Sequence, residues 1–180
     1  MSKEIEKVLI DEEKIKKRVK EMGKSISEDY KDKNLMLVGV LRGAVIFLAD
    51  LVREIKIPIK IDFMAVSSYG SSTKTSGVVR ILKDLNEDIK GKDVLIVEDI
   101  VDTGLTLKYL LKNLKSRKPA SLDVCTLLKK KSEQQTSLNV KYCGFEVPDK
   151  FLVGYGLDWD EKYRNLPQVC ALKPELHIED

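Results

Sequence analysis

Apolar and polar residues alternate along the chain in blocks that predict short strands and amphipathic helices. Over residues 11–30, apolar side chains recur on one helical stripe, and lysine and glutamate fill the positions between them. The apolar runs 34–40, 94–97 and 122–128 predict strands, and the second and third are expected to be buried in a sheet. Because strands and helices alternate, we predict an α/β fold with a mainly parallel twisted sheet flanked by helices on both faces.

The same pattern predicts the remaining elements. In the second helix, the spacing directs Val45, Leu48 and Val52 inwards. The alternation in 59–66 is typical of a strand that is covered well on only one side. The further helices are expected at 44–55 and 106–116, with a short helical turn at 161–166, and the further strands at 59–66, 78–82, 142–147, 151–155 and 169–172.

Residues 67–77 form the most polar stretch of the chain, with serine, threonine and glycine at most positions. Such a segment has little to bury and predicts a mobile loop. It is longer than a hairpin connection needs, which favours an active-site lid over a plain hairpin.

Composition narrows the class of protein. A chain of 180 residues fits one domain, and a net charge of +3 is too mild to indicate a nucleic-acid partner. The absence of a long apolar run and the charged start predict no membrane span and no signal peptide, so we expect a cytoplasmic protein. Three cysteines lie far apart among apolar residues and predict reduced thiols. His177 is the single histidine, which argues against zinc or histidine-based catalysis.

Candidate chemistry gathers where the predicted parallel strands end. Ligands of such sheets bind outside the carboxyl ends of the strands, so Leu41–Gly43, Glu98–Thr106, Lys129–Lys130 and Asp158 should share one rim. The turn after 94–97 leads into a helix N-terminus that suits a phosphate, and its hydroxyls add donors. Its three acidic residues, Glu98, Asp99 and Asp102, indicate a bridging cation, a protonated ligand or a proton-transfer task. The sequence lacks the glycine-rich motifs of P-loop and dinucleotide sites.

The donors of this rim fit a phosphorylated sugar that carries a diphosphate. Glu98 and Asp99 offer hard oxygen ligands for Mg²⁺ or for sugar hydroxyls. Arg42 and Arg164 are candidate clamps for a second, more anionic group, although a surface salt bridge is an equal alternative for either one alone.

The stretch Val-Leu-Ile-Val-Glu-Asp-Ile-Val-Asp-Thr-Gly-Leu-Thr at 94–106 resembles the phosphoribosyl-diphosphate motif of the type I phosphoribosyltransferases. Other motifs resemble the 6-oxopurine branch of that family: the diphosphate loop at 41–43, the Ser-Tyr pair of the lid at 68–69, and the lysine-bearing strand at 127–130. The segments Val147–Asp158 and Lys162–Pro167 resemble its base-binding hood. The resemblance spans about residues 5–173 and implies the type I fold.

The resemblance implies a role for each residue of the acidic turn. Asp102 would be the general base or acid at purine N7; the alternative for an aspartate at this position is a helix N-cap. Glu98 and Asp99 would hold the ribose hydroxyls, directly or through Mg²⁺. The residues expected at the phosphoribosyl group and its 5′-phosphate are Glu98, Asp99, Ile100, Asp102, Thr103, Gly104, Leu105 and Thr106.

The family pattern also implies a metal and a diphosphate site. Asp158 would ligate a second Mg²⁺ on the diphosphate, so the expected metal ligands are Glu98, Asp99 and Asp158. The residues expected to bind the diphosphate are Leu41, Arg42, Gly43, Ser68, Tyr69 and Arg164.

The purine would be recognised by residues from two segments. Lys130 would donate to purine O6, since Leu-Leu-x-Lys is the family spacing, with Lys129 as the alternative. The expected purine-binding residues are Lys130, Phe151, Leu152, Asp158 and Trp159. Two positions depart from the family: Trp159 stands where a tyrosine is usual, and Leu105 stands where many relatives carry a basic residue.

By resemblance, residues 1–180 form one phosphoribosyltransferase domain, with a hood built from the N-terminal segment and about 142–175. The implied activity is purine salvage: transfer of the 5-phosphoribosyl group from 5-phosphoribosyl 1-diphosphate to N9 of hypoxanthine or guanine, giving IMP or GMP and diphosphate. A same-fold transferase for xanthine or a pyrimidine, or a non-catalytic nucleotide-sensing regulator, is the alternative. The family resemblance also implies a homodimer or homotetramer.

Overall fold

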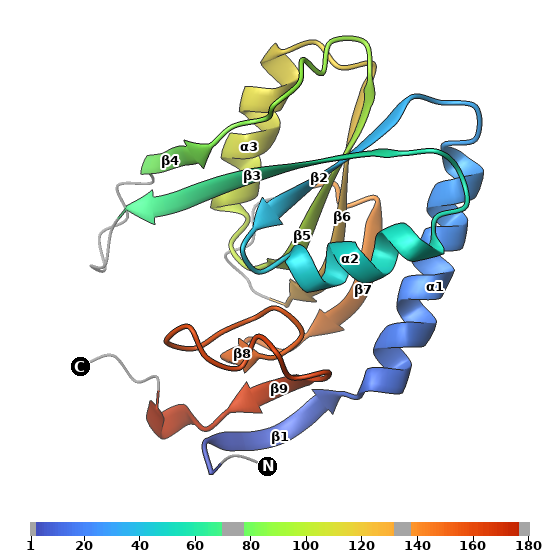
Figure 1. Cartoon of the computed structure of the whole chain (residues 1–180). Coiled ribbons are helices and arrows are strands. Elements are labelled where there is room, and N and C mark those ends of the chain that lie inside the picture. The colour runs from blue at the N-terminus through green and yellow to red at the C-terminus, as the bar shows by residue number, and fades with distance from the viewer. Residues whose placement is uncertain (1–2, 70–77, 132–137, 177–180) are drawn as a thin grey trace.

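The computed structural model describes residues 3–69, 78–131 and 138–176. Its centre is a six-stranded sheet with the order β4-β3-β2-β5-β6-β7 (Figure 1). The pairings along β3-β2-β5-β6-β7 are parallel, and β4 runs antiparallel to β3 at one edge. The strands are β2 Leu35–Leu41, β3 Lys60–Tyr69, β4 Val78–Lys83, β5 Asp93–Val101, β6 Ser121–Lys130 and β7 Tyr142–Val147. The predicted mainly parallel sheet is confirmed.

Helices cover both faces of this sheet. The helices α1 (Glu12–Asp29) and α2 (Val45–Glu54) pack on one face, and α3 (Leu105–Ser116) packs on the other (Figure 1). Two hydrophobic clusters fill the layers, one with the buried side chains of α1 and α2 and one with those of α3. The sheet is therefore the middle of three layers. Because helices cover both of its faces, only the ends of its strands remain open to form a site.

The helix α1 follows the pattern that predicted it. Asp11 caps its first turn by accepting a hydrogen bond from the Lys14 amide at 2.9 Å. Ile15 and Ile26 on its apolar stripe are almost fully buried. The polar side chains between them face solvent, so burial of one stripe attaches the helix to the sheet.

In α2 the prediction for Val45 is wrong. The buried residues are Phe47, Leu48 and Leu51, whereas Val45 is 39% exposed. Residues that are two apart in sequence point in directions about 200° apart around the helix axis. A stripe that includes Phe47 therefore directs Val45 away from the sheet. Val52 is half-buried and packs against the first hydrophobic cluster.

The strand β3 is covered mainly on one side, as predicted, but this is the side of Asp62 and Met64 and not the side of the alternating apolar residues Ile59, Ile61 and Phe63. Met64 and Asp62 are buried, whereas Ile61 is 46% exposed. Asp62 accepts hydrogen bonds from the backbone amides of Phe63 and Asn86 at 2.8 and 2.7 Å. These bonds make burial of the carboxylate possible.

A second, three-stranded antiparallel sheet lies across the carboxyl ends of the parallel strands (Figure 1). It has the order β1-β9-β8, and its strands are β1 Ile5–Ile10, β8 Leu152–Val153 and β9 Val169–Leu172. Residues 142–147, which the predicted hood included, instead pair with β6 in the large sheet.

The short helical turn predicted at 161–166 is wrong. Residues 158–166 form turns with an isolated bridge between Trp159 and Lys162. Glu161 and Tyr163 have φ angles of 59° and 76°, which a right-handed helix does not allow. The remaining short element is a 3₁₀ turn at Pro174–Leu176. No helix within the three described ranges is long and apolar enough to cross a membrane.

Candidate active site

The acidic turn lies at the carboxyl end of β5, in the middle of the large sheet. The prediction placed Glu98 and Asp99 where this strand ends. The strand instead continues to Val101, so both residues belong to its last part. The following turn brings the chain to Gly104, which has a φ of 79° and directly precedes α3. This left-handed conformation favours glycine at that position. The amide of Leu105 lies 3.5 Å from the Thr103 hydroxyl, so the turn closes on the helix N-terminus.

Glu98 and Asp99 occupy opposite faces of β5, because successive side chains of a strand alternate. Glu98 is 8% exposed, and burial, with the charge of Asp99 as a second cause, raises its pKa well above the usual range. Burial also raises the pKa of Asp99 to about 6, against a hydrogen bond from the Ile100 amide and the positive charge of Arg164. Both carboxylates are thus placed where a cation would favour their charged forms.

The loop after β2 approaches Asp99 so closely that a side chain at Gly43 would force the carboxylate or the loop to move. A Cβ atom on Gly43 would lie 1.6 Å from Oδ2 of Asp99. Gly156, with a φ of 100°, packs on the other side of this loop, and its own Cβ would lie 2.1 Å from the Gly43 carbonyl oxygen. The peptide bond between Leu41 and Arg42 is cis. The 41–43 loop therefore contacts both the acidic strand end and the 154–166 segment.

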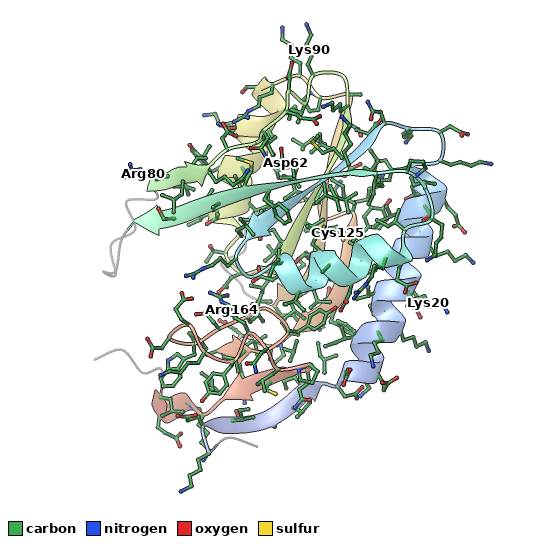
Figure 2. The ribbon with its side chains drawn as sticks, in the orientation of Figure 1. Lys20, Asp62, Arg80, Lys90, Cys125 and Arg164 are labelled. Atoms are coloured by element: carbon green, nitrogen blue, oxygen red, sulfur yellow. The ribbon has the colours of Figure 1, made fainter. Side chains whose placement is uncertain are left out.

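The two predicted arginine clamps are engaged by carboxylates. Arg164 donates to the Gly156 carbonyl at 2.8 Å and pairs with Asp158 at 2.8 Å. Figure 2 shows Arg164 on the side of the small sheet that faces α2. Glu161 bridges the pair, since its carboxylate lies 2.6 Å from Arg42 and 3.6 Å from Arg164. The two guanidinium groups therefore converge on one anion in this structure.

Asp102 and Lys130 face each other across the rim. Nζ of Lys130 lies 2.9 Å from Oδ2 of Asp102 and 3.2 Å from Oδ1 of Asp149. Burial alone would lower the pKa of Lys130, but hydrogen bonds and charge from Asp102 and then Asp149 outweigh it, so the pKa is raised. The lysine is thereby kept as a charged donor beside a carboxylate.

This ion pair borders a cavity of about 190 Å³ between the two sheets. The cavity combines apolar walls with two carboxylates, Asp102 and Asp158, and one ammonium, an arrangement typical of a site for a flat polar heterocycle. Its lining residues are Ile100, Asp102, Lys130, Phe151, Leu152, Leu157 and Asp158.

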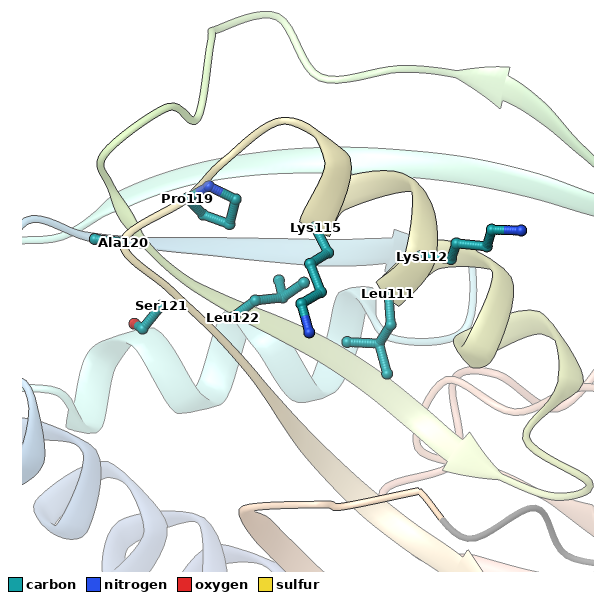
Figure 3. A pocket seen from close by; sticks show the side chains of 7 residues that line it. All are labelled: Leu111, Lys112, Lys115, Pro119, Ala120, Ser121 and Leu122. Atoms are coloured by element: carbon teal, nitrogen blue, oxygen red, sulfur yellow. The ribbon is translucent and has the colours of Figure 1, made fainter.

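A larger groove of about 720 Å³ lies elsewhere, beside the end of α3 and the start of β6 (Figure 3). Its polar groups are Lys112, Lys115 and Ser121, and the other lining residues are apolar or backbone. Volume does not distinguish this groove from a second one of about 720 Å³, which is lined by α1 and residues 54–57. The first groove lacks a carboxylate, and neither groove is lined by a residue of the acidic turn. The chemistry of the side chains identifies the smaller cavity as the candidate active site.

Comparison with known proteins agrees with this geometry. Residues 7–160 match the family model of the phosphoribosyl transferase domain. The hypoxanthine-guanine phosphoribosyltransferase of Mycobacterium avium is 52% identical over 97% of this chain and 89% of its own length. That of Bacillus subtilis (strain 168) is 50% identical over 98% of each chain. The chain belongs to the hypoxanthine-guanine phosphoribosyltransferases.

Solved structures lead to the same family. A hypoxanthine phosphoribosyltransferase from Staphylococcus aureus superposes with a TM-score of 0.93 at 46% identity, over 98% of this chain and 96% of that one. This agreement confirms the type I phosphoribosyltransferase fold that the sequence predicted. The six-stranded sheet and the small sheet described above are thus the architecture of a family member.

The structure brings most of the predicted purine-binding residues of this phosphoribosyltransferase together. Lys130, Phe151, Leu152 and Asp158 line one cavity. Trp159 does not join them: it packs against the hydrophobic cluster of the small sheet. Of the two lysines weighed from sequence, Lys130 is the one that borders the cavity.

Two residues line the cavity without having been predicted at the purine. Ile100 was expected at the phosphoribosyl group, and Leu157 was not expected at the site at all. Leu157 is 8% exposed and directly precedes Asp158. The sequence gives only a weak indication that Leu157 lines a site, because an apolar residue at this position would look the same if it were simply part of the hydrophobic core.

Two predicted diphosphate residues lie next to the edge strand of the large sheet. Ser68 and Tyr69 form the end of β3, and their backbone pairs with β4 at Val79 and Val78. The lid was predicted at 67–77, but residues 67–69 belong to β3 and not to a loop. Residues 70–77 lie outside the described part of the chain.

The predicted metal ligands of this phosphoribosyltransferase form no cluster of three. Within the described residues no group of three or more His, Cys, Asp or Glu side chains could hold a metal. Asp99 and Asp158 are close enough to raise the pKa of Asp99 by charge, and Arg164 lies beside both. Mg²⁺ commonly binds one or two carboxylates and completes its shell with phosphates and water, so this donor set fits a metal that arrives with a phosphorylated ligand.

Proposed function

We propose that this protein transfers the 5-phosphoribosyl group from 5-phosphoribosyl 1-diphosphate to N9 of hypoxanthine or guanine, yielding IMP or GMP and diphosphate. The observation that carries the proposal is the cavity in which Asp102 and Lys130 meet apolar walls. The family relationship, at about half of all positions over nearly the whole chain, supports the same reaction. The role is purine salvage, because a free base is converted to a nucleotide.

The purine fits the cavity with its ring against Phe151 and its polar edge towards Lys130. The ammonium donates to O6, and Asp102 accepts or returns a proton at N7. Leu152 and Asp158 offer backbone groups to the exocyclic edge of the base. Because Trp159 packs into the small-sheet cluster, we assign the stacking role to Phe151.

The phosphoribosyl group is assigned to the acidic turn. The helix N-terminus after Gly104 and the hydroxyls of Thr103 and Thr106 cradle the 5′-phosphate, since the first amides of a helix favour an anion. Glu98 and Asp99 hold the ribose hydroxyls. The backbone of Ile100 and Leu105 completes this wall.

The diphosphate is assigned to the 41–43 loop and to Arg42 and Arg164, with Ser68 and Tyr69 as further contacts. A diphosphate would replace the carboxylate of Glu161, which lies at both guanidinium groups. Arginine suits this task, because its planar fork binds phosphate oxygens in pairs.

We further propose Mg²⁺ as the cofactor, held by Asp99 and Asp158 together with ligand oxygens, with Glu98 at the ribose side. Bound Mg²⁺ would neutralise the charge that develops on the leaving diphosphate. It would also favour the charged form of Asp99, whose pKa is raised by burial.

In the reaction, the bond between C1′ and the diphosphate oxygen breaks and the bond between N9 and C1′ forms. The electron pair of the breaking bond leaves with the diphosphate, and the nucleophile is the lone pair of N9. The carboxylates of Glu98 and Asp99 stabilise the positive charge that develops on the ribose. Asp102 takes up or shares the base proton, so that N9 can attack.

A side-by-side assay tests this function. Purified protein with 5-phosphoribosyl 1-diphosphate and Mg²⁺ is given hypoxanthine, guanine, xanthine or uracil, and nucleotide and diphosphate are quantified. We expect product with hypoxanthine or guanine and loss of product on addition of EDTA. Product only with xanthine or uracil would favour another transferase of the same fold. No diphosphate release with any base would favour a nucleotide-sensing regulator.

We also propose a homodimer or homotetramer in the cytoplasm. Apolar side chains at the surface of α2, β3 and β4 support an association between copies: Val45, Ile46, Ile61 and Leu82 are each more than a third exposed. Cys125, Cys143 and Cys170 are free thiols, as expected in a reducing compartment. Light scattering of the purified protein measures the mass of the assembly.

A further inference from the structure

A carboxylate that the proposed function does not use reaches the base cavity. Oδ1 of Asp149 lies 3.2 Å from Nζ of Lys130, whose side chain is only 14% exposed. Asp149 itself is 63% exposed and approaches from the turn between β7 and β8. Lys130 therefore lies between two carboxylates from different parts of the fold, Asp102 after β5 and Asp149 after β7.

The turn that carries Asp149 is held at both ends. Its neighbour Lys150 donates to both carboxylate oxygens of Glu6 in β1, at 2.9 and 2.8 Å. The amide of Lys150 bonds to the Pro148 carbonyl at 2.9 Å, and the amide of Leu172 in β9 bonds to the Phe151 carbonyl at 3.0 Å. Asp149 is thus fixed on the same backbone that presents the apolar wall of the cavity.

A second carboxylate matters at this lysine because the proposed reaction gives Asp102 another task. In the proposed reaction Asp102 turns to the purine and handles its proton, which weakens its hold on Lys130. A long lysine side chain that loses its partner gains rotamer freedom and no longer presents one geometry to the base. Asp149 is the partner that remains during the reaction.

We propose that Asp149 is a positioning residue of the transfer reaction, which holds the ammonium of Lys130 over the base site while Asp102 acts on the purine. This inference rests on the proposed function. Asp149 acts through Lys130 and touches no substrate, so its removal should affect recognition of the base and leave the sugar diphosphate unaffected.

The test is the variant Asp149→Asn, which keeps the size of the side chain and removes its charge. We expect the KM for hypoxanthine to rise about five- to tenfold, and the KM for 5-phosphoribosyl 1-diphosphate to stay within about twofold. Asp149→Glu should recover part of the loss, since it restores the charge. Because Asp149 is 63% exposed, the variant should fold, and its melting temperature checks this.

A matched control is the neighbouring ion pair. Lys131 and Glu146 also lie 3.2 Å apart, but both side chains face solvent, at 70% and 60% exposure. Glu146→Gln therefore removes a pair of the same type and length, one residue away, that does not border the cavity. Both KM values should stay as in the wild type.

A double-mutant cycle separates action through Lys130 from a general effect on the turn. In a Lys130→Met background, Asp149→Asn should produce no further loss of affinity for IMP, whereas in the wild-type background the loss should be about five- to tenfold. Calorimetric titration with IMP measures this, and it remains readable if Lys130→Met abolishes turnover.

Three results would overturn the inference: an unchanged KM for hypoxanthine in Asp149→Asn, an equal rise of both KM values, or an undiminished effect in the Lys130→Met background. These outcomes differ from failure of the proposed function itself. In that case the wild-type protein would form no nucleotide from hypoxanthine or guanine.

Discussion

At the scale of single residues, the site is made of charged groups whose partners lie within the protein. Lys130 pairs with Asp102, and Arg164 pairs with Asp158. Each pair joins an acidic and a basic side chain at the rim. Glu98 and Asp99 are the exceptions, since burial is the main influence on the pKa of both carboxyl groups.

Asp102→Asn tests the proton-transfer role. The amide keeps the shape of the side chain and can donate to a base, but it cannot accept the proton. We expect kcat to fall by about 10²- to 10⁴-fold, while the affinity for IMP changes by less than about tenfold. Steady-state kinetics and calorimetric titration measure the two quantities, and a turnover equal to that of the wild type would refute the assignment.

The pKa of about 6 for Asp99 predicts a dependence of stability on pH. An unfolded aspartate has a pKa near 4, so between about pH 4 and 6 the folded state binds more protons than the unfolded state. The metal-free protein should therefore lose stability as the pH rises through this window, by at most about 3 kcal/mol from this group.

Asp99→Asn removes that titration. The melting temperature of the variant relative to the wild type, measured in metal-free buffer, should be higher at pH 7.5 than at pH 4.5. If the melting temperatures of variant and wild type differ by the same amount at both pH values, the carboxyl group of Asp99 does not cause the loss of stability.

At the scale of elements, three chain segments meet at Gly43: the loop after β2, the end of β5 and the turn at Gly156. The distances that a Cβ atom on Gly43 or Gly156 would have, 1.6 and 2.1 Å, leave no room for a side chain at either glycine. The mutual placement of the acidic strand end and the 41–43 loop therefore depends on these two residues.

Gly43→Ala should displace Asp99 and the 41–43 loop from each other. A shift of about 1 Å in a catalytic site can cost about 10²-fold in rate, so we expect a loss of this order in kcat/KM for 5-phosphoribosyl 1-diphosphate. Gly91→Ala is the control: its φ of 72° strains an alanine, but its Cβ would meet nothing within 4 Å. This control should lower the melting temperature and leave the kinetic constants unchanged.

At the scale of the whole molecule, the small sheet and the large sheet share one hydrophobic core. Ile10, Leu152 and Val169 of the small sheet belong to the same buried cluster as Leu95 and Val97 of the large sheet. A shared core means that neither sheet can separate without exposing apolar surface of the other.

We therefore expect a single cooperative thermal transition, with equal calorimetric and van't Hoff enthalpies. Val169→Ala, at a fully buried position of β9, should lower the midpoint of that one transition, since the cost of a buried cavity is shared by the whole molecule. Scanning calorimetry measures this. A separate transition that responds alone to Val169→Ala would show instead that the small sheet unfolds independently.

Local pattern determined much of the fold from sequence. The spacing of apolar residues was sufficient to predict α1 and the buried strand β5, because the periods of helix and strand are properties of the backbone alone. The alternation of strands and helices was sufficient to predict a mainly parallel sheet. The motif at 94–106 also identified the family, since a strand end, an acidic pair and a helix N-terminus are consecutive in the chain. These features need no knowledge of distant contacts.

Tertiary structure decided what depends on segments far apart in sequence. The outward direction of Val45, the burial of Asp62, the positive φ angles at 161 and 163 and the packing of Trp159 into the small sheet all follow from neighbours that the local pattern does not reveal. The contact of Lys130 with both Asp102 and Asp149 is of the same kind, because it joins three segments at one cavity. Sequence determined which chemical groups lie at the rim, and packing of the two sheets decided which of them face each other.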